Sequence, residues 1–130
     1  MLVGYDLDGV IAQERFPQSI TRIGYRYFNT LWARFVQSSA KCLYKPKGQF
    51  VIITGRLIFD EKHTWNWLTR NDINPLDVYF ATNNRTPHLH KKSCIERLGL
   101  KMFIESEKWQ ADYLTSECPN CKIVLWENST

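Results

Sequence analysis

The chain has 130 residues, which is the length of one ordinary domain. With 44% hydrophobic and 14% aromatic residues it can form a core, which excludes an intrinsically disordered chain and a collagen-like repeat. No apolar run approaches the ~20 residues that cross a bilayer, and the first six residues lack the features of a signal peptide. We therefore expect a single soluble domain over residues 1–130, located in the cytoplasm, with no membrane partner.

The charge of the chain and its cysteine content indicate which partners and which covalent cross-links to expect. Seventeen Lys and Arg residues against thirteen Asp and Glu residues give a net charge of +4, a mild excess that favours anionic partners without requiring nucleic acid. Four unevenly spaced cysteines do not make a disulfide framework, so we expect free thiols. Cys118 and Cys121 form the chain's one CxxC motif, and a zinc site needs four ligands, so we interpret the pair as loop residues.

Strands and helices are predicted to alternate along the first half of the chain. An apolar run from Leu2 to Leu7 predicts the first strand, and the continuous apolar run Phe50 to Ile53 predicts a second strand buried on both faces. Between them, apolar residues at three- and four-residue spacing predict a long helix from Ser19 to about Ala40. Residues 54–56 are expected to close the second strand.

The second half of the chain continues this alternation. Pro75 separates a helix from the next strand, and Gly99 ends a later helix, as glycine commonly does. The expected elements are a helix over 61–70, a strand over 77–81, a polar loop over 82–89, a helix over 91–98, a strand over 101–104, a helix over 109–114 and a strand over 122–126. The alternation implies an α/β fold, namely a three-layer, doubly wound parallel sheet.

Polar side chains follow several of the predicted strands, and one more, Lys91, opens the helix before the strand over 101–104. In chain order they are Asp6, Asp8, Thr54, Arg56, Lys91, Glu105 and Glu107. Because the carboxyl ends of parallel strands meet at one edge of a sheet, we expect these groups to converge there. Several acids, a hydroxyl group and a cation together are typical of a site for a metal ion and an anion.

Four segments resemble, in order, the motifs of the haloacid dehalogenase (HAD) superfamily, whose members are mostly phosphatases. They are Asp6-Leu7-Asp8-Gly9-Val10, Val51-Ile52-Ile53-Thr54-Gly55-Arg56, Lys91 with Ile95 and Leu98 after it, and Phe103-Ile104-Glu105-Ser106-Glu107. Together they span residues 2–107 in the family's order. The resemblance implies a HAD-like, Rossmann-like domain. For the third motif, the spacing to the two apolar residues favours Lys91 over the adjacent Lys92.

The intervals between motifs bear on whether a cap domain is present. Caps of this superfamily are inserted between the first and second motifs or between the second and third. Here 45 residues separate Asp8 from Thr54, and 34 separate Arg56 from Lys91. A predicted helix uses about half of the first interval, and a helix, a strand and loops use the second. We therefore expect a fold without a large cap domain.

The resemblance implies a Mg²⁺-dependent phosphomonoester hydrolase. Asp6 would attack phosphorus to form an aspartyl-phosphate, since a carboxylate can act as a covalent nucleophile. Asp8 would protonate the leaving oxygen and then deprotonate the hydrolytic water. Thr54, Gly55 and Lys91 would bind the phosphoryl oxygens.

The implied metal site departs from the family's pattern in one place. Mg²⁺ would lie between Asp6, the backbone carbonyl of Asp8 and an acid of the fourth motif. Family members generally carry two adjacent acids there, whereas this chain has Glu105 followed by Ser106. We assign Glu105 as the ligand because it lies at the strand end, with Glu107 as its substitute.

The sequence says less about the substrate than about the reaction. Arg56 either contacts substrate or pairs with Asp60 or Glu61. The run Thr64, Trp67 and Leu68 resembles a segment of small nucleotidases and polynucleotide 3′-phosphatases. Residues in such a run more often pack a helix against the core than stack on a base. We favour a phosphate on a nucleotide or at the end of a nucleic acid. The alternatives are a small-metabolite or phosphoprotein phosphatase, and a HAD-fold binding module with impaired catalysis. The oligomeric state stays open, with a homodimer as one alternative.

Overall fold

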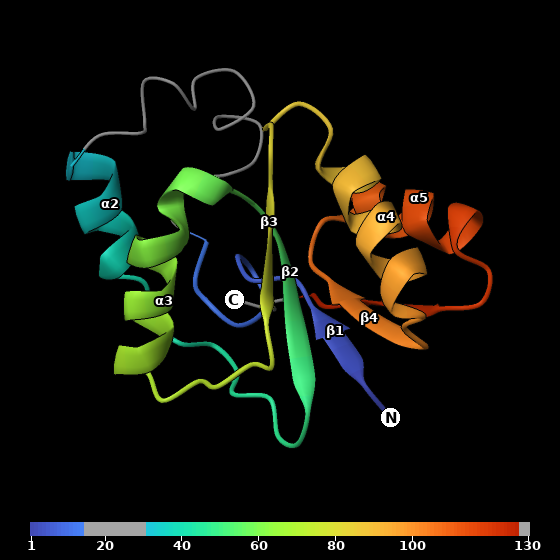
Figure 1. Cartoon of the computed structure of the whole chain (residues 1–130), viewed down its shortest axis with the longest axis horizontal. Helices are drawn as coiled ribbons and strands as arrows, with labels where there is room; N and C mark the ends of the chain where they lie inside the picture. Colours follow the sequence, from blue (N-terminus) through green and yellow to red (C-terminus); the bar gives the residue numbers. More distant parts are fainter. Residues whose placement is uncertain (15–30, 128–130) are drawn as a thin grey trace.

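Five short apolar segments pair side by side into one parallel sheet (Figure 1). The computed structural model describes residues 1–14 and 31–127. The strands are β1 (Val3–Tyr5), β2 (Phe50–Leu57), β3 (Val78–Ala81), β4 (Met102–Glu105) and β5 (Lys122–Leu125), in the order β3-β2-β1-β4-β5. All four strand pairs are parallel, as expected from the alternation of strands with helices.

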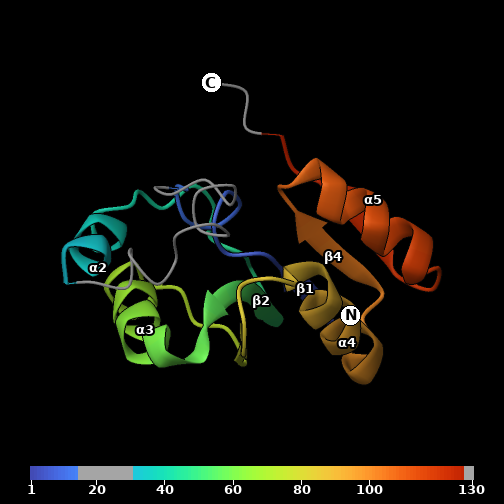
Figure 2. The same ribbon diagram turned by 90° about the horizontal axis from the view of Figure 1, so that it is seen from above.

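Helices cover both faces of this sheet, as Figure 2 shows from above. They are α2 (Leu31–Ser38), α3 (Glu61–Arg70), α4 (Pro87–Leu98) and α5 (Lys108–Glu117), with a 3₁₀ turn, η1 (Ile58–Asp60), before α3. Ile52 and Ile104 lie in the core with Trp67 of α3, whereas the neighbouring Val51 and Phe103 lie in the core on the α4 and α5 side. Successive strand side chains point to opposite faces, so each buried strand contributes to both cores. The predicted three-layer α/β architecture is confirmed.

Two element boundaries differ from the sequence-based expectation. The loop expected over 82–89 is shorter, because α4 begins at Pro87, and Lys91 lies in its second turn rather than at its start. Proline lacks an N–H group and has a fixed φ, so it suits the first turn of a helix. Strand β2 continues to Leu57 rather than ending at Ile53, because its pairing with β3 resumes after a shift in register.

Other differences concern helix lengths. The helix expected from Ser19 to Ala40 is only partly covered, because residues 15–30 lie outside the described residues, and α2 ends at Ser38. Helix α5 runs over Lys108–Glu117, longer than the expected 109–114. The interval 57–90 contains η1, α3, β3 and the first turn of α4, with no further domain in it. Among the described residues, none of the helices has the length and apolar character needed to cross a membrane.

The strand order places β1 at a change of direction in the sheet. From β1 the chain builds outward through β2 to β3, and then returns to the other side of β1 for β4 and β5. In open α/β sheets, ligands bind beside such a switch point, at the carboxyl ends of the strands. The residues that follow β1 and β4 are therefore in the favoured position for a site.

Candidate active site

Asp6 is held directly beyond the end of β1. Its backbone N–H donates to the carbonyl of Ile104 in the neighbouring β4, at 2.9 Å, and so extends the ladder between the two strands. Its side-chain Oδ1 accepts a hydrogen bond from the N–H of Leu7, also at 2.9 Å. The side chain is buried. Backbone pairing on one side and the local hydrogen bond on the other fix the position of this carboxylate.

Two further buried charges meet Asp6 there. Lys91 Nζ lies 2.6 Å from Glu105 Oε1 and 3.4 Å from Asp6 Oδ1, and the side chains of Lys91 and Glu105 are 0% exposed. Burial, and then the nearby charge of Glu105, raise the pKa of Asp6 well above its usual value, against the opposing effect of Lys91. Two carboxyl groups and one ammonium group thus share a buried site.

The ionised partner in this cluster is Glu105. Burial opposes its ionisation, but the charge of Lys91 and a hydrogen bond from Asp6 outweigh that effect and lower the pKa of Glu105. Its other oxygen, Oε2, accepts the backbone N–H groups of Ser106 and Glu107, at 2.8 and 3.0 Å. Lys91 stays charged because the two acids overcome the effect of burial and raise its pKa. The cluster therefore has one firmly held carboxylate and one, Asp6, that is easily protonated.

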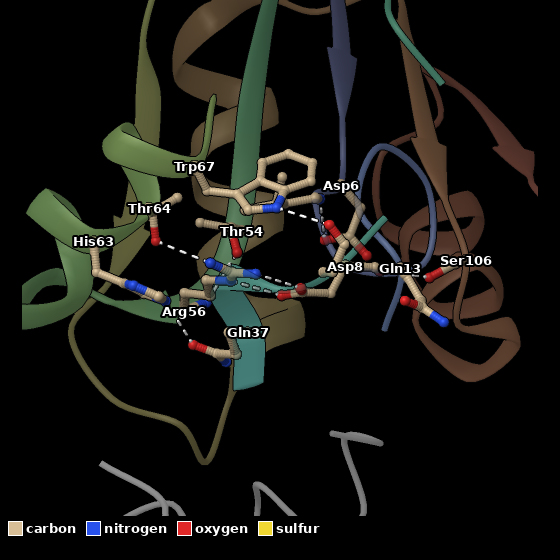
Figure 3. A network of polar contacts seen from close by, with 12 residues as sticks. Asp6, Asp8, Gln13, Gln37, Thr54, Arg56, His63, Thr64, Trp67 and Ser106 are labelled. Carbon is tan, nitrogen blue, oxygen red and sulfur yellow. Dashed lines mark hydrogen bonds and ion pairs between the residues drawn. The ribbon is translucent and has the colours of Figure 1, made fainter. Parts of the chain in front are cut away.

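Arg56 ties Asp8 to helix α3 (Figure 3). Its Nε and Nη2 donate to the two carboxylate oxygens of Asp8, at 2.9 and 2.7 Å, and its Nη1 donates to Thr64 Oγ1 at 3.1 Å. Such a bidentate pair fixes the orientation of a carboxylate as well as its position. Arg56 thus pairs with Asp8, a partner that was not among the alternatives expected from the sequence. The contact with Thr64 was missed, because nothing in the spacing of two polar residues eight apart indicates it.

The second motif shapes the strand end beside Asp8. The N–H of Arg56 donates to Thr54 Oγ1 at 3.0 Å, and a hydroxyl that accepts one hydrogen bond can still donate its own proton to an anion. Gly55 lies close to the start of α4, where a Cβ atom would be 3.4 Å from Pro87 Cβ. The predicted phosphate-binding residues of β2 are therefore buried or half-buried at the carboxyl half of the strand.

Ser106 joins the loops that follow β1 and β4. Its hydroxyl donates to the backbone carbonyl of Asp8 at 3.1 Å. Gly9 has a φ of +91°, and a Cβ atom there would clash with the Ser106 side chain, so glycine is needed for this close approach. Ser106 thus lies against the backbone carbonyl of Asp8, which the sequence analysis expects to be a metal ligand.

The remaining candidates fall in different places. Lys92 is on the surface near Glu96 and Glu117, so it is Lys91 that reaches Asp6. Trp67 is buried and its Nε1 donates to the carbonyl of Ala40 at 3.0 Å. This confirms helix packing as the role of Trp67 and leaves its ring unavailable for stacking on a base.

The donor set fits a hard divalent cation in composition. Asp6 and Glu105 are carboxylates, and the Asp8 carbonyl keeps a second lone pair beside its bond from Ser106. Two buried carboxyl groups close enough to share a hydrogen bond gain from a nearby positive charge. Within residues 1–14 and 31–127, no three His, Cys, Asp or Glu side chains are grouped to hold a metal ion.

Comparisons with known proteins gave no match: no family model fits the chain, and neither a curated protein nor a solved structure matches it.

The contact between Arg56 and Thr64 predicts a loss of stability in Thr64→Val. The substitution keeps the shape of the side chain but leaves a buried guanidinium N–H without its acceptor, which costs about 1–3 kcal/mol. Urea unfolding of the wild type and the variant measures the difference. Thr69→Val, at an exposed position on the same helix, is the control and is expected to change stability by less than about 0.5 kcal/mol. Equal losses in both variants would contradict the proposed role.

Asp60 predicts a pH-dependent effect on stability. Burial, and then the charge of Asp8, raise the pKa of Asp60 from 3.8 to about 6. The folded chain thus holds this proton more tightly than the unfolded chain, so Asp60 destabilises the fold increasingly as the pH rises from about 4 to 6. Asp60→Asn is expected to be more stable than the wild type above that range, by about 1–2 kcal/mol after allowance for solvent screening. Melting temperatures from acid to neutral pH test this, and a difference that does not change with pH would contradict it.

Proposed function

We propose that the chain is a Mg²⁺-dependent phosphomonoester hydrolase of the HAD type, in which Asp6 is the nucleophile. One observation carries the proposal: a buried aspartate held at the switch point of a parallel sheet, with a buried lysine ammonium 3.4 Å from its carboxylate. The ammonium group attracts an anion to the carboxylate that would attack it. The order of the four resembling segments along the chain supports the same conclusion.

The residues divide the chemistry between them. Asp6 Oδ attacks phosphorus, the bond to the leaving oxygen breaks, and the phosphoryl group is transferred to Asp6. Asp8 in its protonated form gives its proton to the leaving oxygen. The Asp8 carboxylate then accepts a proton from the water that attacks the aspartyl-phosphate, which releases inorganic phosphate and regenerates Asp6. Arg56 holds the Asp8 carboxylate in one orientation between these steps. The Thr54 hydroxyl and Lys91 Nζ bind the phosphoryl oxygens as charge develops on them.

Asp6, the carbonyl of Asp8 and Glu105 would hold Mg²⁺, with Glu107 as the substitute ligand. Bound Mg²⁺ supplies positive charge that offsets the repulsion between a carboxylate and a phosphate dianion. Glu107 joins the cluster through its backbone N–H, and burial followed by the charge of Glu105 raises the pKa of its side chain. We assign the direct contact to Glu105 because its side chain already lies beside Asp6.

We propose a nucleotide or the end of a polynucleotide as the substrate. The support for this choice is the net charge of +4, because the buried Trp67 cannot stack on a base. A small-metabolite or phosphoprotein phosphatase is the alternative within the same chemistry. The alternative without catalysis is a HAD-fold binding module. The serine at position 106 favours it, because the resemblance leads us to expect an acid there. Cytoplasmic location belongs to this proposal as well.

An array of phosphomonoesters separates these functions. The wild type is incubated with nucleotides, oligonucleotides with a 3′- or 5′-phosphate, sugar phosphates and phosphopeptides, with and without Mg²⁺, and released phosphate is measured. Mg²⁺-dependent release from at least one class supports the hydrolase, and the preferred class identifies the substrate. If no phosphate is released while a ligand still binds, the protein is a binding module and the proposal is wrong.

A further inference from the structure

The charges that surround the candidate metal position leave it with only a small net negative charge. When both acids are ionised to bind a cation, Asp6 and Glu105 carry two negative charges, and Lys91 contributes one positive charge at 3.4 and 2.6 Å from them. The carboxylate of Asp8 is neutralised by a bidentate pair with Arg56. The inner groups therefore present about one net negative charge to a cation of charge +2, in a site where burial strengthens each interaction.

Ser106, whose side chain contacts the Asp8 carbonyl, adds no charge to this sum. Ser106 Oγ donates to that carbonyl at 3.1 Å, and the tight packing against Gly9 holds the hydroxyl there. Mg²⁺ prefers charged oxygens in octahedral geometry, and a neutral hydroxyl is a poor replacement for a carboxylate. Glu105 also has fewer lone pairs left for a metal ion, since its two oxygens already accept hydrogen bonds from Lys91 and from the backbone N–H groups of Ser106 and Glu107.

From these contacts we infer that Ser106 makes divalent-cation binding conditional on a bound phosphate. A phosphate dianion beside Lys91 and Thr54 supplies the negative charge and oxygen ligands that the protein lacks, so metal and phosphate bind together and each binds weakly alone. By linkage, the factor by which phosphate raises the affinity for Mg²⁺ equals the factor by which Mg²⁺ raises the affinity for phosphate. This inference rests on the proposed function and deepens it: resting protein stays metal-free, and substrate recruits the metal.

Calorimetric titration with Mg²⁺, in the absence and presence of inorganic phosphate, tests the inference without any measurement of turnover. For the wild type, phosphate is expected to raise the affinity for Mg²⁺ by roughly 5- to 150-fold, the usual range of coupling between two sites. Blank titrations of Mg²⁺ into phosphate correct for their association in solution. Equal Mg²⁺ affinities with and without phosphate would overturn the inference, whatever the variants do.

Two substitutions assign the effect to position 106. Ser106→Asp adds a charge, and it is expected to raise the affinity for Mg²⁺ alone and to reduce the effect of phosphate. Ser106→Asn adds similar bulk next to Gly9 without the charge, and it is expected to keep the wild-type coupling. If Ser106→Asp shows the same coupling as Ser106→Asn, the inference is wrong. Phosphatase activity that requires Mg²⁺, together with uncoupled binding, would overturn the inference alone, whereas activity without Mg²⁺ would overturn the metal-dependent function itself.

Discussion

Replacement of Asp6 by asparagine is expected to abolish phosphomonoester hydrolysis while the fold stays at least as stable. Loss of a covalent nucleophile costs roughly 10⁴- to 10⁶-fold in kcat, and an amide nitrogen or oxygen cannot form the aspartyl-phosphate. The fold does not suffer, because burial and Glu105 raise the pKa of Asp6 above its usual 3.8. A carboxyl group with a raised pKa destabilises the folded state as the pH rises through the ordinary value, and Asp6→Asn removes that cost at neutral pH.

The measurement is kcat on the best substrate of the array, with urea unfolding of the same preparations. Asp112→Asn is the matched control, since Asp112 is an exposed aspartate that pairs with the exposed Lys108 on α5. We expect wild-type activity from this control. Turnover in Asp6→Asn within tenfold of the wild type would rule out Asp6 as the nucleophile, and a large loss of stability would contradict the electrostatic account of the cluster.

The second large effect is expected in Lys91→Met. Methionine keeps the length of the side chain but leaves Glu105 buried as a carboxylate without its cation, beside the carboxyl group of Asp6. Removal of one partner from a buried ion pair costs about 3–5 kcal/mol, because the remaining charge is uncompensated. Activity is expected to fall by at least about 10²-fold in addition, since a positive charge that stabilises the phosphoryl group is lost.

Two comparisons make this prediction specific. Lys92→Met removes the adjacent lysine, which is on the surface 3.9 and 3.7 Å from its acidic partners, and it is expected to change stability by less than about 1 kcal/mol. Lys91→Met combined with Glu105→Gln removes both charges, and it is expected to regain part of the lost stability without regaining activity. Urea unfolding gives each value. If Lys91→Met and Lys92→Met have the same stability, the buried cluster does not have the role assigned to it.

Much of the fold was predictable because the central strand β2 is buried on both faces. An apolar run such as Phe50–Ile53 has few alternatives to a central strand, and polar residues after it mark the edge where a site can form. The boundary at Leu57 was not predictable, because the extension of β2 depends on a shifted register with β3 that the sequence does not indicate. The earlier start of α4 had a signal, since proline is common in the first turn of a helix.

The candidate site, like the fold, was predictable in part. The sequence places Asp6 and Glu105 at the ends of strands that the sheet order makes neighbours, and Lys91 in the helix before β4, so their convergence was predictable. The link from Arg56 to Thr64 depends on the side-chain rotamer and on how α3 packs, neither of which leaves a trace in residue spacing. In the same way, the contact of the Ser106 hydroxyl with the Asp8 carbonyl exists only because two loops far apart in sequence approach closely.

Chemical trapping of the intermediate tests the central claim most directly. The wild type is mixed with its best substrate and Mg²⁺, quenched within the first turnover, and reduced with borohydride, which converts an aspartyl-phosphate to homoserine. Peptide mass spectrometry then locates the change. The account predicts homoserine at position 6, and only in samples that received substrate. An unmodified Asp6 in an enzyme that is turning over, or homoserine at Asp8 instead, would contradict it.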